Sequence, residues 1–297
     1  MSRRGLVLFA AMSLIWGMPY LFIKVAVAEV APPVVVAGRT SLAALVLVPL
    51  AIRAGALRPA LARWRPLLAF TVIEMAVPWL LLTDAERRIP SGLTGLLIAT
   101  VPLAGTVVAF VLGDRDALAP RRLIGLGVGM GGVACIIGFD LGGGSGTWRS
   151  VLEIMGVAVG YAIAPFIADR HLHDVPALGV VAASLAGVAI VYVPIALVVR
   201  PEQMPSAKAI GALLALASIC TGVAFLLFFA LIAEVGPGKS TLITFINPAV
   251  AVSLGVAVRG ESFTVTTGFG FVLVLAGCRL ATSRPQRASV HHEGVAA

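Results

Sequence analysis

The chain has 297 residues, of which 59% are hydrophobic and only 12% are charged, and its formal net charge is +8. Soluble domains carry about 25% charged residues, so this chain has too little charge to cover a surface that faces water. Its basic residues are scattered among the ends of apolar stretches without interleaved aromatic residues, which excludes the usual footprint of a nucleic-acid-binding protein. We therefore expect an all-α, polytopic membrane protein.

Ten apolar stretches follow one another along the chain, each close to the roughly 17–25 residues that a membrane-spanning helix requires. The connections between them are too short for a soluble domain. We expect a first five-helix unit at residues 1–142, a second at 150–282, and a polar cytoplasmic tail at 283–297. The ten predicted helices lie near residues 6–28, 33–52, 66–83, 92–112, 122–139, 151–168, 176–199, 209–232, 238–258 and 264–282.

The first predicted helix carries Trp16, Tyr20 and Lys24 at intervals of four residues, so these side chains share one face. Such a seam either packs against neighbouring helices or lines a pathway for a polar or aromatic solute. Lys24 also interrupts the segment where a cleavable signal peptide would end, so we expect the helix to be retained. Lys24 and Arg39, on the second helix, lie close enough to the predicted outer helix ends for their charges to extend to the interface.

The third predicted helix contains TVIEMAVPWLLL, in which Glu74 lies about 12 Å from the helix start, near the bilayer centre. A carboxylate there costs at least about 2.5–3.5 kcal/mol, so it must face a cavity or a partner. One interpretation is a group that exchanges a proton or binds a substrate amine. The other is a structural ion pair with Arg39 or Lys24, or a protonated carboxyl bonded to the backbone. Pro78 frees the Glu74 carbonyl and is a candidate gating bend. Glu74 and Trp79, which follows Pro78 on the same helix, are candidates for the substrate pathway.

Other predicted helices carry prolines and a few polar or aromatic residues at membrane depth. Each proline frees a backbone carbonyl one turn earlier, and is either a bend used in gating or an ordinary kink. The prolines are Pro19, Pro102, Pro165 and Pro248. Further pathway candidates are Tyr161 and Asn247, with Thr100 and Thr221 weaker because a helix hydroxyl can bond its own backbone.

The cysteines and histidines indicate no metal site, and we expect no cofactor. Cys135, Cys220 and Cys278 all fall within apolar helices, where cysteine behaves as a small hydrophobic residue. The four histidines have no neighbouring residues at ligand spacing.

Glycines form a ridge of small residues on the fifth predicted helix. GxxxG spacing permits close helix packing, either within the protomer or in a dimer. The ridge comprises Gly125, Gly127, Gly129, Gly131 and Gly132.

The distribution of positive charge predicts the orientation. With the N-terminus in the cytoplasm, the cytoplasmic loops and tail hold fourteen of the 22 Lys and Arg residues, and the opposite loops hold six. The remaining two, Lys24 and Arg39, lie within helices. The positive-inside rule then places both termini in the cytoplasm.

The two halves of the chain share a pattern. At an offset of 146 residues, LIWGMPYLFIK (14–24) aligns with GYAIAPFIADR (160–170), and TVPLAGTVVAFVLG (100–113) with INPAVAVSLGVAVR (246–259). A repeated unit with an odd number of helices enters the membrane in the opposite orientation. We therefore predict two inverted five-helix repeats around a central cavity.

Several segments resemble the EamA domains of the drug/metabolite transporter (DMT) superfamily: LIWGMPYLFIK, VVVAGRTSLAALVL, TVPLAG, INPAVA, GDRDALAPRRLIGLGVGMGGVA and RGESFTVTTGFGFVLVLAGC. The resemblance covers nearly the whole chain, up to about Ser283. One departure is Gly113-Asp114, where EamA repeats usually have Gly-Glu, as Gly260-Glu261 does here. The resemblance implies a ten-helix inverted repeat that exports small metabolites or amino acids, without fixing the substrate.

The predicted function is a secondary transporter that exports amino acids or related small metabolites across a bacterial inner membrane by alternating access. Uptake or exchange of a nucleotide-linked or drug-like solute is the alternative within transport. A membrane-embedded enzyme is the alternative from another class, but no HExxH, GxSxG or repeated acidic motif is present, and we expect no enzymatic activity. The expected partners are a small-molecule substrate, the lipid bilayer and protons. We expect a monomer or a weak dimer that binds no nucleic acid.

Overall fold

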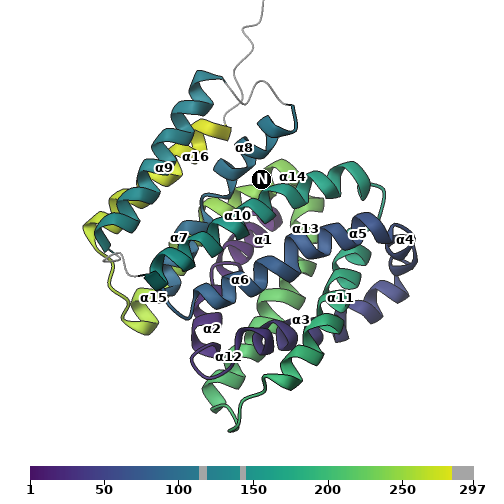
Figure 1. The fold of residues 1–297 in the computed structure, drawn as a ribbon. Helices are drawn as coiled ribbons and strands as arrows, with labels where there is room; N and C mark the ends of the chain where they lie inside the picture. Colours follow the sequence, from purple (N-terminus) through teal and green to yellow (C-terminus); the bar gives the residue numbers. More distant parts are fainter. Residues whose placement is uncertain (114–118, 141–144, 283–297) are drawn as a thin grey trace, which may run out of the picture.

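The computed structural model describes residues 1–113, 119–140 and 145–282, and these residues are almost entirely helical. The predicted all-α polytopic class is confirmed, and helices overlap with each of the ten predicted stretches (Figure 1). The first five spans are α1 (Arg3–Ile15) with α2 (Pro19–Ala26); α3 (Pro32–Arg53); α5 (Trp64–Phe70), η1 (Thr71–Ala76) and α6 (Val77–Ala85); α7 (Ser91–Ile98) with α8 (Val101–Val111); and α9 (Pro120–Asp140). A short helix, α4 (Leu57–Ala62), connects the second and third spans.

The second half has the same number of spans. They are α10 (Ser145–His171); α11 (Ala177–Val198); α12 (Ala207–Ala217), η3 (Ser218–Val223) and α13 (Ala224–Val235); α14 (Pro237–Ser240), η4 (Thr241–Phe245) and α15 (Asn247–Arg259); and α16 (Val265–Thr282). Asp114 and the tail from 283 lie outside the described residues.

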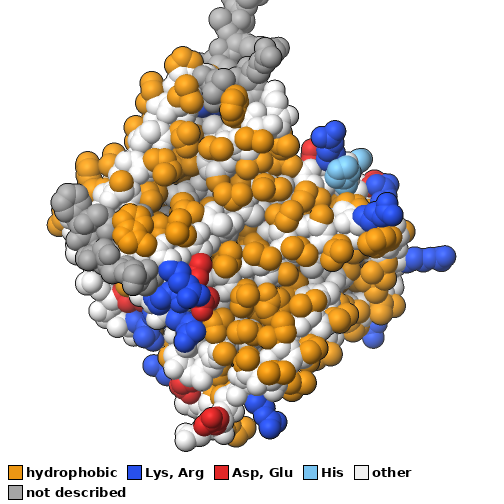
Figure 2. Space-filling model, viewed as in Figure 1, with side chains coloured by type: hydrophobic (Ala, Val, Ile, Leu, Met, Phe, Trp, Pro, Cys, Tyr) orange, Lys and Arg blue, Asp and Glu red, His pale blue; other side chains and the backbone are white. Residues whose placement is uncertain are grey.

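The surface of the bundle suits a lipid environment. Among the described residues, eight stretches are long and apolar enough to cross a membrane, and α9 and α16 occupy the other two predicted positions. Leu45, Ile190 and Val198 are among many large hydrophobic side chains that are exposed, at 72%, 74% and 84%. Figure 2 shows charged side chains gathered in a few patches separated by continuous hydrophobic surface. Soluble monomers rarely expose such a surface, so these faces contact lipid.

Three of the predicted prolines mark breaks within spans. Pro19 is the first residue of α2, and Pro102 and Pro248 are the second residues of α8 and α15. Proline is tolerated at these positions because the N–H that it lacks would have no partner within the helix. Pro165 differs, since it lies inside α10, which continues from Ser145 to His171 without a break. The helix is therefore interrupted at Pro19 but not at the aligned Pro165, and a gating role for these prolines stays a prediction.

Several extensive contacts join the spans in pairs that are unchanged when the two halves are exchanged. The fifth span packs against the tenth (α9 with α16), the second against the seventh (α3 with α11), and the fourth against the ninth (α7 with α15). The third packs against the sixth (α6 with α10), and the first against the eighth (α2 with α12, and α1 with α13). Replacing each span by its counterpart five positions away returns the same set, which supports the predicted repeat.

Glycines allow α9 and α16 to pack closely within the protomer, as Figure 1 shows at one edge of the bundle. A Cβ added to Gly277 would lie 2.6 Å from the Gly125 carbonyl oxygen, and one added to Gly132 would lie 2.6 Å from that of Gly270. Gly127 and Gly131 are exposed, with no atom within 4 Å of an added Cβ. Part of the predicted glycine ridge therefore serves packing inside the protomer.

Candidate substrate site

A buried arginine forms the centre of the candidate site. Arg39 extends from α3 into the bundle, where it is 8% exposed. Its guanidinium carbon lies 3.6 Å from the centroid of the Trp79 ring, and its Nε donates to Thr221 Oγ1 at 2.8 Å. The sequence predicted that Arg39 would extend outwards to the interface. The structure instead holds its charge inside by a cation–π contact and a hydrogen bond.

No carboxylate of the described residues forms an ion pair with Arg39. The bond to Thr221 uses Nε alone, and no hydrogen bond from the two terminal nitrogens is found within the described part of the chain. The guanidinium therefore keeps its forked pair of donors for another group.

Two π-helical segments flank the site at equivalent places in the two halves. The segment η1 interrupts the third span and η3 interrupts the eighth, and their bounds differ by 147 residues. Thr221 lies in η3, where its hydroxyl accepts from Arg39 and donates to the Leu216 carbonyl at 2.9 Å. Segments of this kind are frequent at functional sites because they disturb the regular backbone hydrogen bonding. Pro78 signals the first segment in the sequence, whereas the second has no proline after it.

Glu74 lies in η1 and is half-buried. No ion pair joins it to Arg39 or Lys24 within the described residues, so the structural pair predicted as an alternative does not form. Tyr161, on α10, interacts electrostatically with both Glu74 and Arg39, and it packs against the buried cluster that contains Trp79. Tyr161 is therefore related electrostatically to both groups, whereas no direct interaction between Glu74 and Arg39 is found.

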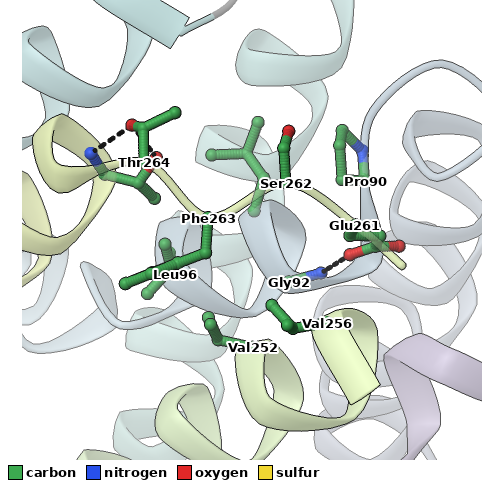
Figure 3. Close-up of a pocket in the computed structure, with 11 residues that line it drawn as sticks. Pro90, Gly92, Leu96, Val252, Val256, Glu261, Ser262, Phe263 and Thr264 are labelled. Atoms are coloured by element: carbon green, nitrogen blue, oxygen red, sulfur yellow. Dashed lines mark hydrogen bonds between the residues drawn. The ribbon is translucent and has the colours of Figure 1, made fainter. Parts of the chain in front are cut away.

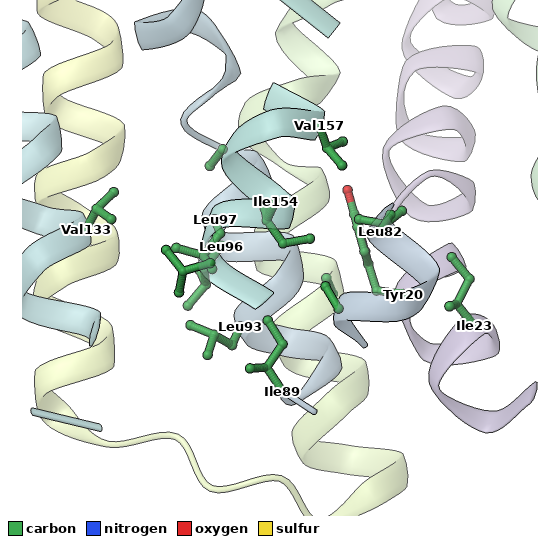
Figure 4. Close-up of a cluster of buried hydrophobic side chains, with 14 of the residues drawn as sticks. Tyr20, Ile23, Leu82, Ile89, Leu93, Leu96, Leu97, Val133, Ile154 and Val157 are labelled. Atoms are coloured by element: carbon green, nitrogen blue, oxygen red, sulfur yellow. The ribbon is translucent and has the colours of Figure 1, made fainter. Parts of the chain in front are cut away.

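Tyr20 is the fourth predicted pathway residue near Arg39. It is 9% exposed and belongs to the main cluster of buried side chains, where Figure 4 shows it beside Leu82. Its phenol interacts electrostatically with Tyr161 and Arg39. Trp79 therefore stacks on the guanidinium, and Tyr20 and Tyr161 are buried aromatic residues whose phenols interact electrostatically with it.

Trp16, Asn247 and Thr100 are occupied by other contacts. The centroid of the Trp16 ring lies 4.6 Å from the centroid of the Phe228 ring on α13. With its nitrogen facing acceptors, the Asn247 amide donates to two backbone carbonyls, in η4 and α1, at 2.9 and 3.1 Å. The Thr100 hydroxyl donates to the carbonyl three residues earlier at 2.6 Å. All three lie at breaks between helices, and none of their contacts found in the described part of the chain is with the guanidinium.

The predicted outer end of the bundle is closed by polar contacts. Lys24 Nζ donates to the backbone carbonyls of Glu86 and Ile89, at 2.5 and 2.8 Å, in the turn after α6. Lys24 is thus held by the end of another helix rather than by Glu74. The Glu86 side chain is 0% exposed. Sequence reasoning missed Glu86 because it precedes Arg87 and Arg88 in a stretch typical of an exposed loop.

Glu261 completes this closure by holding the start of α7. Its carboxylate accepts from the Ser91 backbone N–H, the Ser91 hydroxyl and the Gly92 backbone N–H, at 2.9, 2.8 and 2.9 Å. A carboxylate at a helix N-terminus satisfies free N–H groups and complements the helix dipole. The Gly260-Glu261 pair contributed to the family resemblance, but the residues that the Glu261 carboxylate binds could not be predicted from the sequence.

A small pocket opens beside Glu261, between α7, α15 and the segment that leads into α16 (Figure 3). Leu96, Val252 and Phe263 line it together with Glu261. None of the predicted pathway residues is among its walls. The pocket therefore belongs to the outer closure and not to the site around Arg39.

Known proteins resemble this chain along most of its length. The EamA-like transporter family matches residues 3–138 and 148–283. Proteins named "Uncharacterized inner membrane transporter YedA", from Escherichia coli strains K12 and O157:H7, are 30% identical over 94% of this chain and 93% of their own length. A protein of known crystal structure is 20% identical, with a TM-score of 0.65 over 94% of this chain and 96% of that one, and shares the fold. The family match covers both five-helix halves, and the chain belongs to the EamA-like transporter family.

Proposed function

We propose that this chain is a secondary transporter that exports amino acids or related small metabolites across a bacterial inner membrane. Membership of a transporter family supports the transport of a small molecule. The name of the YedA relatives supports the inner membrane as the location. The exchange symmetry of the helix pairs supports two inverted repeats that rock around a central site in alternating access.

The proposed substrate class is inferred from Arg39, whose guanidinium forms no ion pair with the described residues. A charge removed from water is costly unless an opposite charge or hydrogen bonds replace its hydration. Trp79 covers one face of the guanidinium and Thr221 takes Nε, which leaves the terminal nitrogens for a ligand. A carboxylate fits this fork in a bidentate manner. The substrate therefore presents a carboxylate to Arg39.

Glu74 supplies the opposite charge for a substrate amine. It forms no ion pair with Arg39, so each group remains available for a ligand. Tyr161 interacts with both charges and, with Tyr20 and Trp79, provides apolar ring surface for the rest of the solute. An amino acid carries both charged groups on a small frame.

The test is transport by the purified protein in liposomes, using a panel of labelled amino acids with and without a pH gradient. For each amino acid that is transported, the unlabelled parent should compete, whereas its methyl ester and its N-acetyl derivative should compete poorly. The ester lacks the carboxylate for Arg39, and the N-acetyl form lacks the amine for Glu74. Competition by the ester equal to that of the parent would contradict recognition by Arg39. Preferred movement of a nucleotide-linked solute would favour the alternative substrate class.

A further inference from the structure

Glu86 is a buried carboxyl group that is not part of the proposed substrate site around Arg39. It follows α6, is 0% exposed, and neither of its carboxylate oxygens has a hydrogen-bond partner within the described residues. Lys24 lies beside it, but the ammonium group donates to backbone carbonyls. An ionised carboxylate without hydrogen bonds is strongly disfavoured in such a place, whereas the protonated form carries no charge to be solvated.

Charged and titratable groups from several elements face Glu86. Positive charge nearby favours its ionised form, whereas Glu261 and the C-terminal end of α6 oppose it. Burial has the largest effect and raises the pKa of Glu86 well above its ordinary range, although the Lys24 charge acts in the other direction. The groups that interact with Glu86 are Lys24 and Tyr20 on α2, Arg39 on α3, Arg259 on α15, and Glu261.

The position of Glu86 ties it to the closure of the outer end. The turn that contains it is held by Lys24, and Glu261 holds the start of α7 immediately after that turn. At the opposite end of the bundle, the repeat aligns Lys24 with Arg170, which is exposed, and Glu86 with Ile232. The aligned positions in the described part of the opposite end therefore hold no buried carboxyl, and the protonation of Glu86 acts at the outer end.

We propose that Glu86 is a proton-binding site that couples the closure of the outer end to proton uptake. The proposal rests on the proposed alternating access. In the sealed form described here, the Glu86 carboxyl carries a proton. When the outer end opens, water solvates the carboxyl and the proton leaves. Because the sealed form binds one more proton than the open form, raising the pH shifts the population towards the open form.

The experiment measures access to a cysteine placed under the closure. Leu93 lies in the first turn of α7 at the wall of the pocket beside Glu261, where its side chain is only 7% exposed. Met204 lies in an outer loop and is 89% exposed. Leu93→Cys and Met204→Cys are each labelled from outside with a membrane-impermeant maleimide over a range of pH, above the background of the parent chain. The Met204→Cys signal corrects for the pH dependence of the reagent. The corrected labelling of Leu93→Cys should rise with pH.

Glu86→Gln should abolish this rise and keep labelling low, because glutamine imitates the protonated carboxyl. The matched control is Glu202→Gln, an exposed carboxylate in an outer loop, which should keep the wild-type profile. Glu86→Asp keeps a titratable group and should shift the midpoint without removing the rise.

A flat profile for Leu93→Cys in otherwise wild-type protein overturns the proposal, as does an unchanged rise in Glu86→Gln. If Glu86→Gln does not reach the membrane, the labelling profiles of Leu93→Cys in the wild-type and Glu86→Asp backgrounds test the proposal. An unchanged midpoint in Glu86→Asp would then overturn it. Labelling needs no substrate, so a failed amino-acid transport assay leaves this result intact. The two proposals therefore fail separately.

Discussion

Replacing Arg39 with lysine should weaken substrate binding without unfolding the protein. Lysine keeps the positive charge but loses the planar fork, the stacking on Trp79 and the Nε–H that Thr221 accepts. If a substrate carboxylate binds the fork in a bidentate manner, lysine retains only one of the two bonds. The change therefore tests the geometry of Arg39 separately from its charge.

The expected magnitude follows from these contacts. A hydrogen bond to a charged group contributes about 1.5–3 kcal/mol. At about 1.4 kcal/mol for each factor of ten, loss of one such bond weakens binding by roughly 10–150-fold. Arg39→Gln also removes the charge and leaves the substrate carboxylate unpaired, at a cost of about 2–5 kcal/mol, or roughly 30-fold to several thousand-fold.

The assay is equilibrium binding of a transported amino acid to the purified protein, together with its thermal unfolding without ligand. Arg53→Lys is the matched control, because Arg53 is an exposed arginine at the end of the same helix. Arg39→Met should leave the unfolding temperature of the ligand-free protein unchanged or raise it, since an apolar side chain of similar length replaces a buried charge without an ionic partner.

Two results would refute this reasoning. One is substrate affinity in Arg39→Lys within about twofold of wild type, where one lost charge-assisted bond predicts at least roughly tenfold. The other is a large fall in the unfolding temperature of ligand-free Arg39→Met, which would show that the guanidinium holds the bundle together rather than awaiting a ligand.

Three further predictions concern other parts of the chain. Glu74→Gln should insert normally but lose transport or its pH dependence in liposomes, and normal transport with an unchanged pH dependence would remove Glu74 from the pathway. Glu261→Ala should destabilise the protein by about 0.5–2 kcal/mol in thermal unfolding, because the start of α7 loses its capping carboxylate, whereas Glu202→Ala should have no effect. Gly277→Ala should cost about 1–3 kcal/mol by forcing α9 and α16 apart, and equal stability of Gly277→Ala and Gly127→Ala would contradict the close packing described here.

The membrane class and the positions of the spans could be predicted from the sequence. Lipid offers no hydrogen-bond partners, so a long apolar stretch must satisfy its own backbone as a helix. Proline chemistry also predicted the breaks at Pro19, Pro102 and Pro248. It did not predict the continuous helix at Pro165, because a membrane helix can satisfy the carbonyl that a proline frees through neighbouring groups or local adjustment of the backbone.

The direction of each polar side chain was decided by the tertiary structure. In a membrane protein the lipid and the interior of the bundle are both apolar, so hydrophobic periodicity does not show which face of a helix is buried. The sequence singled out Glu74 by its depth, but the inward path of Arg39 depends on Thr221, which is 182 residues away. Glu86 illustrates the same limit. Its neighbours in the chain are typical of an exposed loop, and only the packing of α2 and Lys24 over the end of α6 removes its carboxyl from water.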